Sequence, residues 1–308
     1  MKTNWTAADM PSQAGRSFVI TGTGGLGYEC GLALARAGGD VILAGRNATK
    51  GQQAVNSIRA AVAGATISFE LLDLASLASI TAFGQRMRRT RSNLDVLINN
   101  AGVMVPPRRQ MTEDGFELQI GTNYLGHFAL TAHLLPLLAR GDKARVVSLS
   151  SIAARQGAID FSNLNAERSY TPMPIYTQSK LACLMLAYEL QRRSNAANWG
   201  ITSIAAHPGV SRTDLLHNAP GRFSFNRFAR SFLWFLFQPA AQGALPTLYA
   251  ATAPDAQPGG YYGPHRLSET RGYPAVAKPI PQAADEQVAR RLWEVSEDMT
   301  NVRFGEAI

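Results

Sequence analysis

The sequence contains very little cysteine and no long apolar run. Its 308 residues include two cysteines, Cys30 and Cys183. Each falls in a segment with helical periodicity, so we expect two separate buried thiols and no disulfide. No stretch of about 18 consecutive apolar residues is present, which predicts that no helix spans a membrane. The segment from Met1 to Arg16 lacks the apolar core of a signal peptide. A cytoplasmic location is therefore expected.

Dense clusters of charge and of metal-binding side chains are also missing. The chain carries 30 Lys and Arg against 22 Asp and Glu, a net charge of +8, and a basic balance favours anionic partners such as nucleotides. The densest basic group, Arg86 to Arg91, falls late in a predicted helix, where cations are favourable. A solvated helix face explains it better than a nucleic-acid patch, so no nucleic-acid partner is expected. No group of His, Cys and carboxylates has the spacing of a metal site.

What is present is a regular alternation of strand-like and helix-like segments. The composition is 46% hydrophobic and 17% charged, as in ordinary soluble domains. Short β-branched runs lie at Ser17–Thr21, Asp40–Ala44, Thr66–Leu71, Leu94–Ile98, Arg145–Leu149 and Ile201–Ala206. Segments with helical periodicity lie between them, among them Leu26–Ala37, Thr49–Val62, Ser76–Arg89 and Thr112–Ala139. The alternation predicts an α/β fold, a single Rossmann-type doubly wound parallel sheet of about seven strands with helices on both faces.

The pattern changes after Gly209. Residues 210–237 are rich in Phe and Arg and show no strand. A helix is expected over Pro239–Ala253, a short strand near Gly259–Tyr262, and a polar tail that ends in a helix over Asp285–Met299. No linker separates these parts, so residues 1–308 are predicted to form one nucleotide-binding domain.

A glycine-rich turn follows the first predicted strand. Gly22, Gly24 and Gly27 satisfy the pattern G-x-G-x-x-G between a strand and a helix. Glycine permits a tight turn and a close approach of the backbone to a pyrophosphate, and the helix N-terminus offers free N–H groups to the anion. The motif alone is also compatible with a plain strand–helix turn. In this context we interpret Gly22, Gly24, Gly25, Leu26 and Gly27 as part of a dinucleotide site.

The end of the second predicted strand indicates which dinucleotide binds. NAD-binding proteins carry an acidic residue there, which binds the ribose 2′-hydroxyl. Here the strand runs into Gly45-Arg46-Asn47 and has no carboxylate. Because a guanidinium pairs well with phosphate, Arg46 is a candidate for binding the 2′-phosphate of NADP(H), and NAD(H) is the less favoured cofactor. A solvated loop arginine is the alternative.

A tyrosine and a lysine stand four residues apart at the start of another predicted helix. Tyr176 and Lys180 therefore share one helix face. A nearby ammonium stabilises tyrosinate, which makes a tyrosine usable as a proton donor or acceptor near neutral pH. Further polar residues end strands of the same sheet, in Asn99-Asn100-Ala101-Gly102, Ser150-Ser151 and His207-Pro208-Gly209. Such ends meet at the carboxyl edge of a parallel sheet, where these folds bind ligands.

Taken in order, these motifs resemble the short-chain dehydrogenase/reductase family. The order is the glycine-rich turn, Asp73 after the third strand, N-N-A-G, Asn123 within a helix, the serine of the fifth strand, Y-x-x-x-K and P-G. The stretches Ile120–Phe128 and Tyr176–Ala182 are similar to retinol dehydrogenase-like, WW-domain oxidoreductase-like and protochlorophyllide reductase-like members. The resemblance covers nearly the whole chain.

The resemblance implies a role for each motif residue. Tyr176 would be the general acid in reduction and the base in oxidation, and Lys180 would hold the nicotinamide ribose and favour ionisation of Tyr176. Ser151, rather than Ser150, would hydrogen-bond the substrate oxygen. Asn123 would anchor a water that relays protons to Lys180. Beyond the glycine turn and Arg46, the residues expected at the cofactor are Asp73, Leu74, Asn99, Ala101, Gly102, Tyr176, Lys180, Pro208, Gly209 and Thr213. Purely structural roles, as helix-kink or capping residues, are the alternatives for Asn123, Ser151 and Thr213.

The chain also departs from the family at its glycine turn. The turn has one residue fewer than the usual T-G-x-x-x-G-x-G, so a residue that often helps to bind phosphate has no counterpart. Two functions therefore stay open. The favoured one is an NADP(H)-dependent oxidoreductase that interconverts a carbonyl compound and its alcohol. The alternative is a dinucleotide-binding regulatory or scaffold protein without turnover.

The aromatic residues of 210–237 bear on the substrate. This segment is expected to cover the nicotinamide as a substrate lid, which favours a lipophilic substrate. Its aromatic residues are Phe223, Phe225, Phe228, Phe232, Trp234, Phe235 and Phe237. A packed helix, an oligomer contact, or a weak contact with a membrane surface through interleaved arginines are the alternatives. His127, His207 and Met104–Pro107 are expected to border the pocket. Many relatives are dimers or tetramers, which implies a homodimer or homotetramer here.

Overall fold

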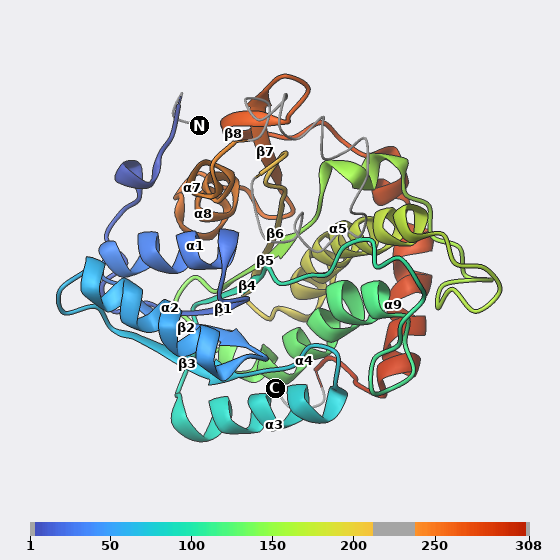
Figure 1. Cartoon of the computed structure of the whole chain (residues 1–308), viewed down its shortest axis with the longest axis horizontal. Coiled ribbons are helices and arrows are strands. Elements are labelled where there is room, and N and C mark those ends of the chain that lie inside the picture. Colours follow the sequence, from blue (N-terminus) through green and yellow to red (C-terminus); the bar gives the residue numbers. More distant parts are fainter. Residues whose placement is uncertain (1–3, 212–237, 306–308) are drawn as a thin grey trace.

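The computed structural model describes residues 4–211 and 238–305, and it is built around one eight-stranded sheet (Figure 1). The strands are β1 (Ser17–Thr21), β2 (Asp40–Gly45), β3 (Ile67–Leu71), β4 (Val96–Asn99), β5 (Arg145–Leu149), β6 (Thr202–Ala206), β7 (Tyr261–Arg266) and β8 (Arg271–Val276). They lie in the order β3-β2-β1-β4-β5-β6-β7-β8. The first seven pair in parallel, and β8 pairs antiparallel with β7. The predicted α/β class and doubly wound parallel sheet are confirmed, with one strand more than expected.

Alternate residues of the central strands supply two separate cores. Phe18 and Ile20 of β1 pack on one face of the sheet, and Val19 packs on the other. Because neighbouring side chains of a strand point to opposite faces, a continuous apolar strand needs helices on both sides. One face is covered by α1 (Gly25–Arg36), α2 (Ala48–Ala61), α7 (Ala240–Gly243) and α8 (Leu245–Thr252). The other is covered by α3 (Leu77–Thr90), α4 (Gly126–Leu138), α5 (Pro172–Ala197) and α9 (Glu286–Thr300).

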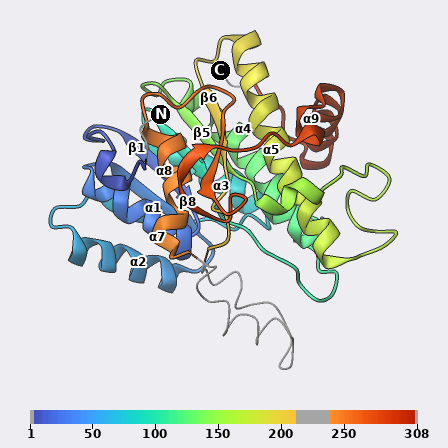
Figure 2. The same ribbon diagram turned by 90° about the horizontal axis from the view of Figure 1, so that it is seen from above.

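Elements far apart in the sequence meet around this sheet. Figure 2 shows α7 and α8 beside α1, and α9 on the outer side of α5. Short helical turns lie at η1 (Ala7–Asp9), η3 (Ile152–Gln156) and η6 (Pro281–Ala284). Cys30 in α1 and Cys183 in α5 are both buried and free, and they lie in different cores. Among the described residues, none of the helices has the length and apolar character needed to cross a membrane.

The single helix expected over Thr112–Ala139 is interrupted. Met111 and Glu117 form a short bridge, and a π-helical turn, η2 (Ile120–Leu125), precedes α4. In this turn the N–H of Gly126 bonds to the carbonyl of Gly121, five residues earlier. Such π turns occur frequently at functional sites. Here the turn contains Asn123, one of the residues singled out above.

The C-terminal part also differs in detail from expectation. The helix expected over Pro239–Ala253 is two helices, α7 and α8, that meet at Ala244. Pro246 at the start of α8 has no N–H to continue the bonding pattern of α7. The short strand expected near Gly259 is β7, and β8 follows it as an additional edge strand. The proposed lid, residues 210–237, lies outside the described residues except for Val210 and Ser211.

Candidate active site

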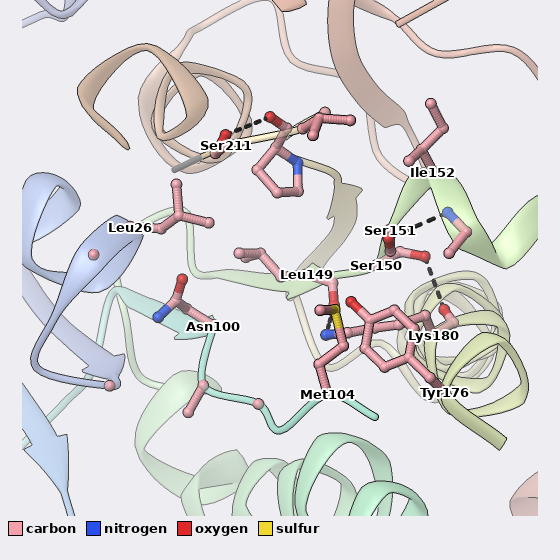
Figure 3. Close-up of a pocket in the computed structure, with 18 of the residues that line it drawn as sticks. Leu26, Asn100, Met104, Leu149, Ser150, Ser151, Ile152, Tyr176, Lys180 and Ser211 are labelled. Carbon is pink, nitrogen blue, oxygen red and sulfur yellow. Dashed lines mark hydrogen bonds between the residues drawn. The ribbon is translucent and has the colours of Figure 1, made fainter. Parts of the chain in front are cut away.

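A cavity of about 590 Å³ opens at the carboxyl ends of the parallel strands, where doubly wound sheets bind ligands. Its walls come from the glycine turn after β1, Lys50 of α2, the segment after β4, the end of β5 with η3, the first half of α5, and the segment after β6 (Figure 3). Eleven of the 22 lining residues are ones that the sequence predicted as catalytic or cofactor-binding: Gly22, Gly24, Gly25, Leu26, Ala101, Gly102, Ser151, Tyr176, Lys180, Pro208 and Gly209. The topology therefore brings six separate parts of the chain to one place.

The glycine turn is a tight bend that glycine alone allows. Gly22 has φ of +93°, and its N–H donates to the carbonyl of Ala44 at 2.7 Å. A Cβ on Gly27 would lie 2.3 Å from the carbonyl oxygen of Gly22. Gly24 begins α1 without any side-chain cap. The first-turn N–H groups of α1 therefore have no capping side chain, and Gly25 and Leu26 of that turn line the cavity.

Tyr176 and Lys180 lie on one face of α5 and point into the cavity (Figure 3). Their exposed fractions are 6% and 5%. The Nζ of Lys180 donates to the carbonyl of Leu149, the last residue of β5, at 3.1 Å. The end of β5 thus holds the ammonium of Lys180 at the cavity wall. Tyr176 lies on the same face of α5, one helical turn earlier.

The two serines after β5 have different contacts. The hydroxyl of Ser150 is buried and donates to the main-chain carbonyl of Lys180 at 2.8 Å. The Oγ of Ser151 accepts the N–H of Ala153 at 3.2 Å, and Ser151 caps η3. Because Oγ of Ser151 acts as an acceptor in that bond, its own proton is free for another partner. Ser150 therefore fastens α5 to β5, while Ser151 offers a donor to the cavity.

Asn123 lies behind the cavity wall and does not line it. Its Nδ2 donates to the carbonyl of Val103 and to Oγ of Ser179, both at 3.0 Å. Its Oδ1 accepts the N–H of Val103 at 2.7 Å. Ser179 in turn donates to the carbonyl of Tyr176 at 2.8 Å. Asn123 thus joins the segment after β4 to the helix turn that carries Tyr176.

A buried histidine links Asn123 to the glycine turn. The Nδ1 of His127 lies 2.8 Å from the carbonyl of Asn123, and its Nε2 lies 2.9 Å from Oγ1 of Thr21. Because a carbonyl only accepts, Nδ1 carries the proton and Nε2 accepts from Thr21. Thr21 also accepts the N–H groups of Asn100 and Ala101, both at 2.9 Å. Burial lowers the pKa of His127 to about 4, so the ring is neutral at pH 7.

Residues 16–221 match the family model described as short chain dehydrogenase. The chain belongs to the short-chain dehydrogenase family. The match includes all six segments of the cavity wall, since it extends from before β1 to beyond Ser211.

Named relatives of this short-chain dehydrogenase are oxidoreductases. Mouse polyprenol dehydrogenase is 39% identical over 97% of the chain and 88% of its own length. Mouse retinol dehydrogenase 13 is 40% identical over 93% of the chain and 85% of its own length. Together with the family, these relatives identify the chain as an oxidoreductase.

Solved structures support the same fold. The crystal structure of an uncharacterized protein from Mycobacterium paratuberculosis has 39% identity and a TM-score of 0.82, over 98% of this chain and 99% of that one. RhlG of Pseudomonas aeruginosa, solved with NADP in its active site, has 22% identity and a TM-score of 0.64, over 81% of this chain and 94% of RhlG. At that identity the likeness of RhlG to this dehydrogenase concerns the fold alone.

Several predicted residues of this dehydrogenase lie away from the cavity. Asn99 is buried, and its Nδ2 donates to Oγ1 of Thr131 in α4 at 3.0 Å. Asp73 accepts the N–H of Ala75 and shapes the turn after β3, and Leu74 packs in the core. Arg46 is exposed at the end of β2. The predicted cofactor residues that do not line the cavity are Gly27, Arg46, Asp73, Leu74 and Asn99. Thr213 lies outside the described residues.

The cavity also contains residues that the sequence motifs did not single out for the cofactor. They are Thr23, Lys50, Asn100, Met104, Leu149, Ser150, Ile152, Ala153, Met173, Val210 and Ser211. Asn100 donates through Nδ2 to the carbonyl of Thr21 at 2.7 Å. Of the expected bordering residues, Met104 lines the cavity, whereas His127 and His207 lie behind its walls. The sequence could have indicated Asn100 as the second asparagine of N-N-A-G. It could have indicated Lys50 as a cation four residues after Arg46.

Proposed function

We propose that the protein is an NADP(H)-dependent oxidoreductase that interconverts a lipophilic carbonyl compound and its alcohol. The proposal rests on one observation. Ser151, Tyr176 and Lys180 line the same cavity as the glycine turn. A proton donor, a buried cation and a hydroxyl donor next to an anion-binding helix end are the groups that hydride transfer to a carbonyl requires.

The residues present fit a dinucleotide. The uncapped N-terminus of α1 offers its N–H groups to a pyrophosphate. At the other end of the cavity, Lys180 is buried with the Leu149 carbonyl as its hydrogen-bond partner, which leaves two ammonium donors for ribose hydroxyls. Lys50 lines the cavity and Arg46 lies four residues earlier. Both cations suit the 2′-phosphate that distinguishes NADP(H) from NAD(H).

The chain's own groups supply the proton chemistry. In reduction, Ser151 donates a hydrogen bond to the carbonyl oxygen, and Tyr176 transfers its hydroxyl proton to that oxygen. The ammonium of Lys180 stabilises the resulting tyrosinate. When bound, the nicotinamide cofactor supplies the hydride. In oxidation Tyr176 takes the proton back from the alcohol, so the same three side chains serve both directions.

Apolar cavity walls support a lipophilic substrate. The side chains of Leu26, Met104, Leu149, Ile152, Met173 and Val210 line the cavity. Met173 is 46% exposed, so apolar surface continues towards solvent. Relatives are named for polyprenol and retinol, which are long lipophilic alcohols. Retinaldehyde and a long-chain prenyl aldehyde are therefore the first substrates to assay.

The substitution Tyr176→Phe tests the proposal. Loss of a general acid lowers turnover about 10²- to 10⁴-fold, whereas NADPH binding, followed by quenching of tryptophan fluorescence, should persist. Tyr188→Phe is the matched control, because Tyr188 is on the same helix and packs against the core away from the cavity. Turnover by Tyr176→Phe at the wild-type rate would contradict the assigned role. Failure of the wild-type protein to bind NADPH or NADH would reject the proposed function and the dinucleotide-binding alternative together. Binding of NADPH without turnover of any lipophilic carbonyl compound or alcohol would favour the alternative.

A further inference from the structure

The turn between β7 and β8 has an unusual backbone. Leu267, Ser268 and Glu269 all have positive φ, at +48°, +54° and +67°. Side chains other than glycine rarely adopt this region, and three in succession are rarer still. Such conformations persist where surrounding contacts impose them, and they gather at functional sites. The contacts of Glu269 therefore indicate what this turn holds.

The carboxylate of Glu269 joins three segments of the chain. It is 7% exposed. Its Oε2 accepts Nε2–H of His207 at 3.0 Å and an N–H of Arg155 at 2.5 Å. Its Oε1 accepts the main-chain N–H of Lys278 at 2.8 Å. Burial acts to raise the pKa of Glu269, but these hydrogen bonds and the charge of Arg155 hold it below its usual value. The group is therefore a carboxylate with a partner for each oxygen.

One of these links runs to the wall after β6. The Nδ1 of His207 accepts the N–H of Gly209 at 3.2 Å, so the neutral ring carries its proton on Nε2, facing Glu269. Burial also lowers the pKa of His207, which favours that neutral form. The N–H of Val210 donates to the carbonyl of Thr270 at 2.8 Å. A Cβ on Gly209 would lie 2.4 Å from the same carbonyl. The turn thus lies directly against Gly209 and Val210, which line the cavity.

The other link runs to the wall after β5. Arg155 belongs to η3, which begins immediately after Ser151. Besides its bond to Glu269, Arg155 donates to the carbonyl of Ser268 at 3.2 Å. Ile152 and Ala153 of the same short helix line the cavity. The position of Ser151 is therefore tied to the turn that also holds Gly209.

We propose that Glu269 is a positioning residue. It holds the segment after β5, which carries Ser151, in a fixed position relative to the segment after β6, which carries Gly209. The inference rests on the proposed function, since Ser151 is taken as the substrate-oxygen donor and Gly209 as a cofactor contact. Glu269 lies beyond residue 221, where the match to the family model ends. The support comes from the turn between β7 and β8, which contributes no side chain to the cavity lining.

The substitution Glu269→Gln tests this role, with Glu286→Gln as control. Glu286 is on the exposed side of α9 and pairs with Arg290. A shift of a donor by a fraction of an ångström lowers turnover strongly, so we expect kcat of Glu269→Gln to fall about tenfold. The thermal midpoint of each variant is measured alongside, and the control should retain wild-type kcat and KM. Wild-type kcat and KM in Glu269→Gln would overturn the proposal.

Two further variants separate the two links. Arg155→Gln releases η3, and we expect a lower kcat with unchanged NADPH affinity. His207→Asn keeps an acceptor for Gly209 but loses the donor to Glu269, and we expect a higher Kd for NADPH. Arg155 has a side chain that is 29% exposed, so this variant serves if Glu269→Gln does not fold, and wild-type kcat there would overturn the proposal. Absence of NADPH-dependent turnover in the wild-type protein would instead reject the proposed function, and the positioning role with it.

Discussion

Arg46 and Lys50 lie four residues apart around the start of α2, and Lys50 alone of the two lines the cavity. The sequence predicts that Arg46 binds the 2′-phosphate, because Arg46 follows β2 at the place where NAD-binding proteins carry a carboxylate. The structure adds Lys50, whose main-chain N–H donates to the capping side chain of Asn47 at 2.9 Å. Two cations at one helix N-terminus form a suitable place for a phosphate.

Substitution of these cations tests the cofactor preference. We expect Lys50→Gln and Arg46→Gln each to weaken NADPH binding about tenfold, because each removes a cation that we propose to contact the 2′-phosphate. NADH binding should not change, since NADH lacks that phosphate. Fluorescence titration of both nucleotides measures the ratio, with Arg36→Gln at the end of α1 as control. Equal weakening of NADPH and NADH would assign the residues to another part of the cofactor.

Side-chain direction along β4 separates what the sequence could predict from what it could not. Leu97 packs in the core that includes α4, and Ile98 packs in the opposite core. Asn99 therefore points to the side of Leu97, where it meets Thr131. Asn100 follows the strand and lines the cavity. The motif N-N-A-G predicts the location but not which asparagine faces the ligand, because that depends on the register of β4. The cofactor roles of Asp73, Leu74 and Asn99 stay predictions.

At the scale of elements, the glycine turn is fixed by steric contact within the chain. Alanine normally favours a helix over glycine by about 1 kcal/mol. In Gly27→Ala, however, Cβ would meet the carbonyl of Gly22 at 2.3 Å. We expect a loss of about 1 to 3 kcal/mol in the free energy of unfolding, as for other overpacked sites, together with weaker NADPH binding.

Urea unfolding and NADPH titration check this prediction. Gly64→Ala is a useful control, because Gly64 has φ of +74° but no atom within 4 Å of its added Cβ. It introduces backbone strain without a steric contact and lies far from the turn in sequence. A Gly27→Ala variant as stable as the wild-type protein would show that the turn can open to admit a methyl group.

The elements that the sequence did not predict are those defined by tertiary contacts. Strands β1 to β6 follow the predicted apolar runs closely because burial on both faces requires such runs. The π turn of η2 cannot be seen in the periodicity, since Asn123 is placed there by Val103, Ser179 and His127. β8 contains Gly272 and Pro274 and ends at Val276, which is 73% exposed. An exposed edge strand needs no apolar alternation, so its sequence carries little signal.

At the scale of the whole molecule, buried neutral histidines make stability depend on pH. The pKa of His127 is lowered by burial from 6.5 to about 4. Between these values the unfolded chain binds a proton that the folded protein does not. Stability is therefore full above pH 6.5 and falls as the pH drops towards 4. Between pH 7.5 and 5 this group alone lowers the free energy of unfolding by about 2 kcal/mol.

Urea unfolding at pH 7.5 and pH 5 tests this prediction. His127→Asn should have a smaller difference in unfolding free energy between the two pH values than the wild-type protein. A slope will remain, because burial also lowers the pKa of His133 and of His207. An unchanged slope in His127→Asn would mean that His127 takes up its proton in the folded protein as readily as in the unfolded chain.

The predicted architecture of the whole chain is confirmed as a doubly wound sheet of the short-chain dehydrogenase family. Its topology follows from alternating β and α segments and right-handed crossovers, which leave few arrangements open. The side-chain contacts between distant segments do not follow from the alternation of β and α segments. Nothing in the spacing of His207 and Glu269 indicates that they meet, since 62 residues separate them. Such pairs depend on the way in which β7 and β8 complete the sheet.

The contacts of Glu269 also bear on how genes of this type can recombine. The codons for Ser151, Tyr176 and Lys180 lie within the stretch that matches the family model, residues 16–221. The codon for the carboxylate that holds Arg155 and His207 lies well downstream. A crossover between the two stretches would join the proposed reactive centre from one parent to the proposed positioning residue from another. With the role proposed for Glu269, a hybrid whose parents both carry Arg155, His207 and Glu269 keeps the contacts between the two stretches, and a hybrid that lacks one of them does not.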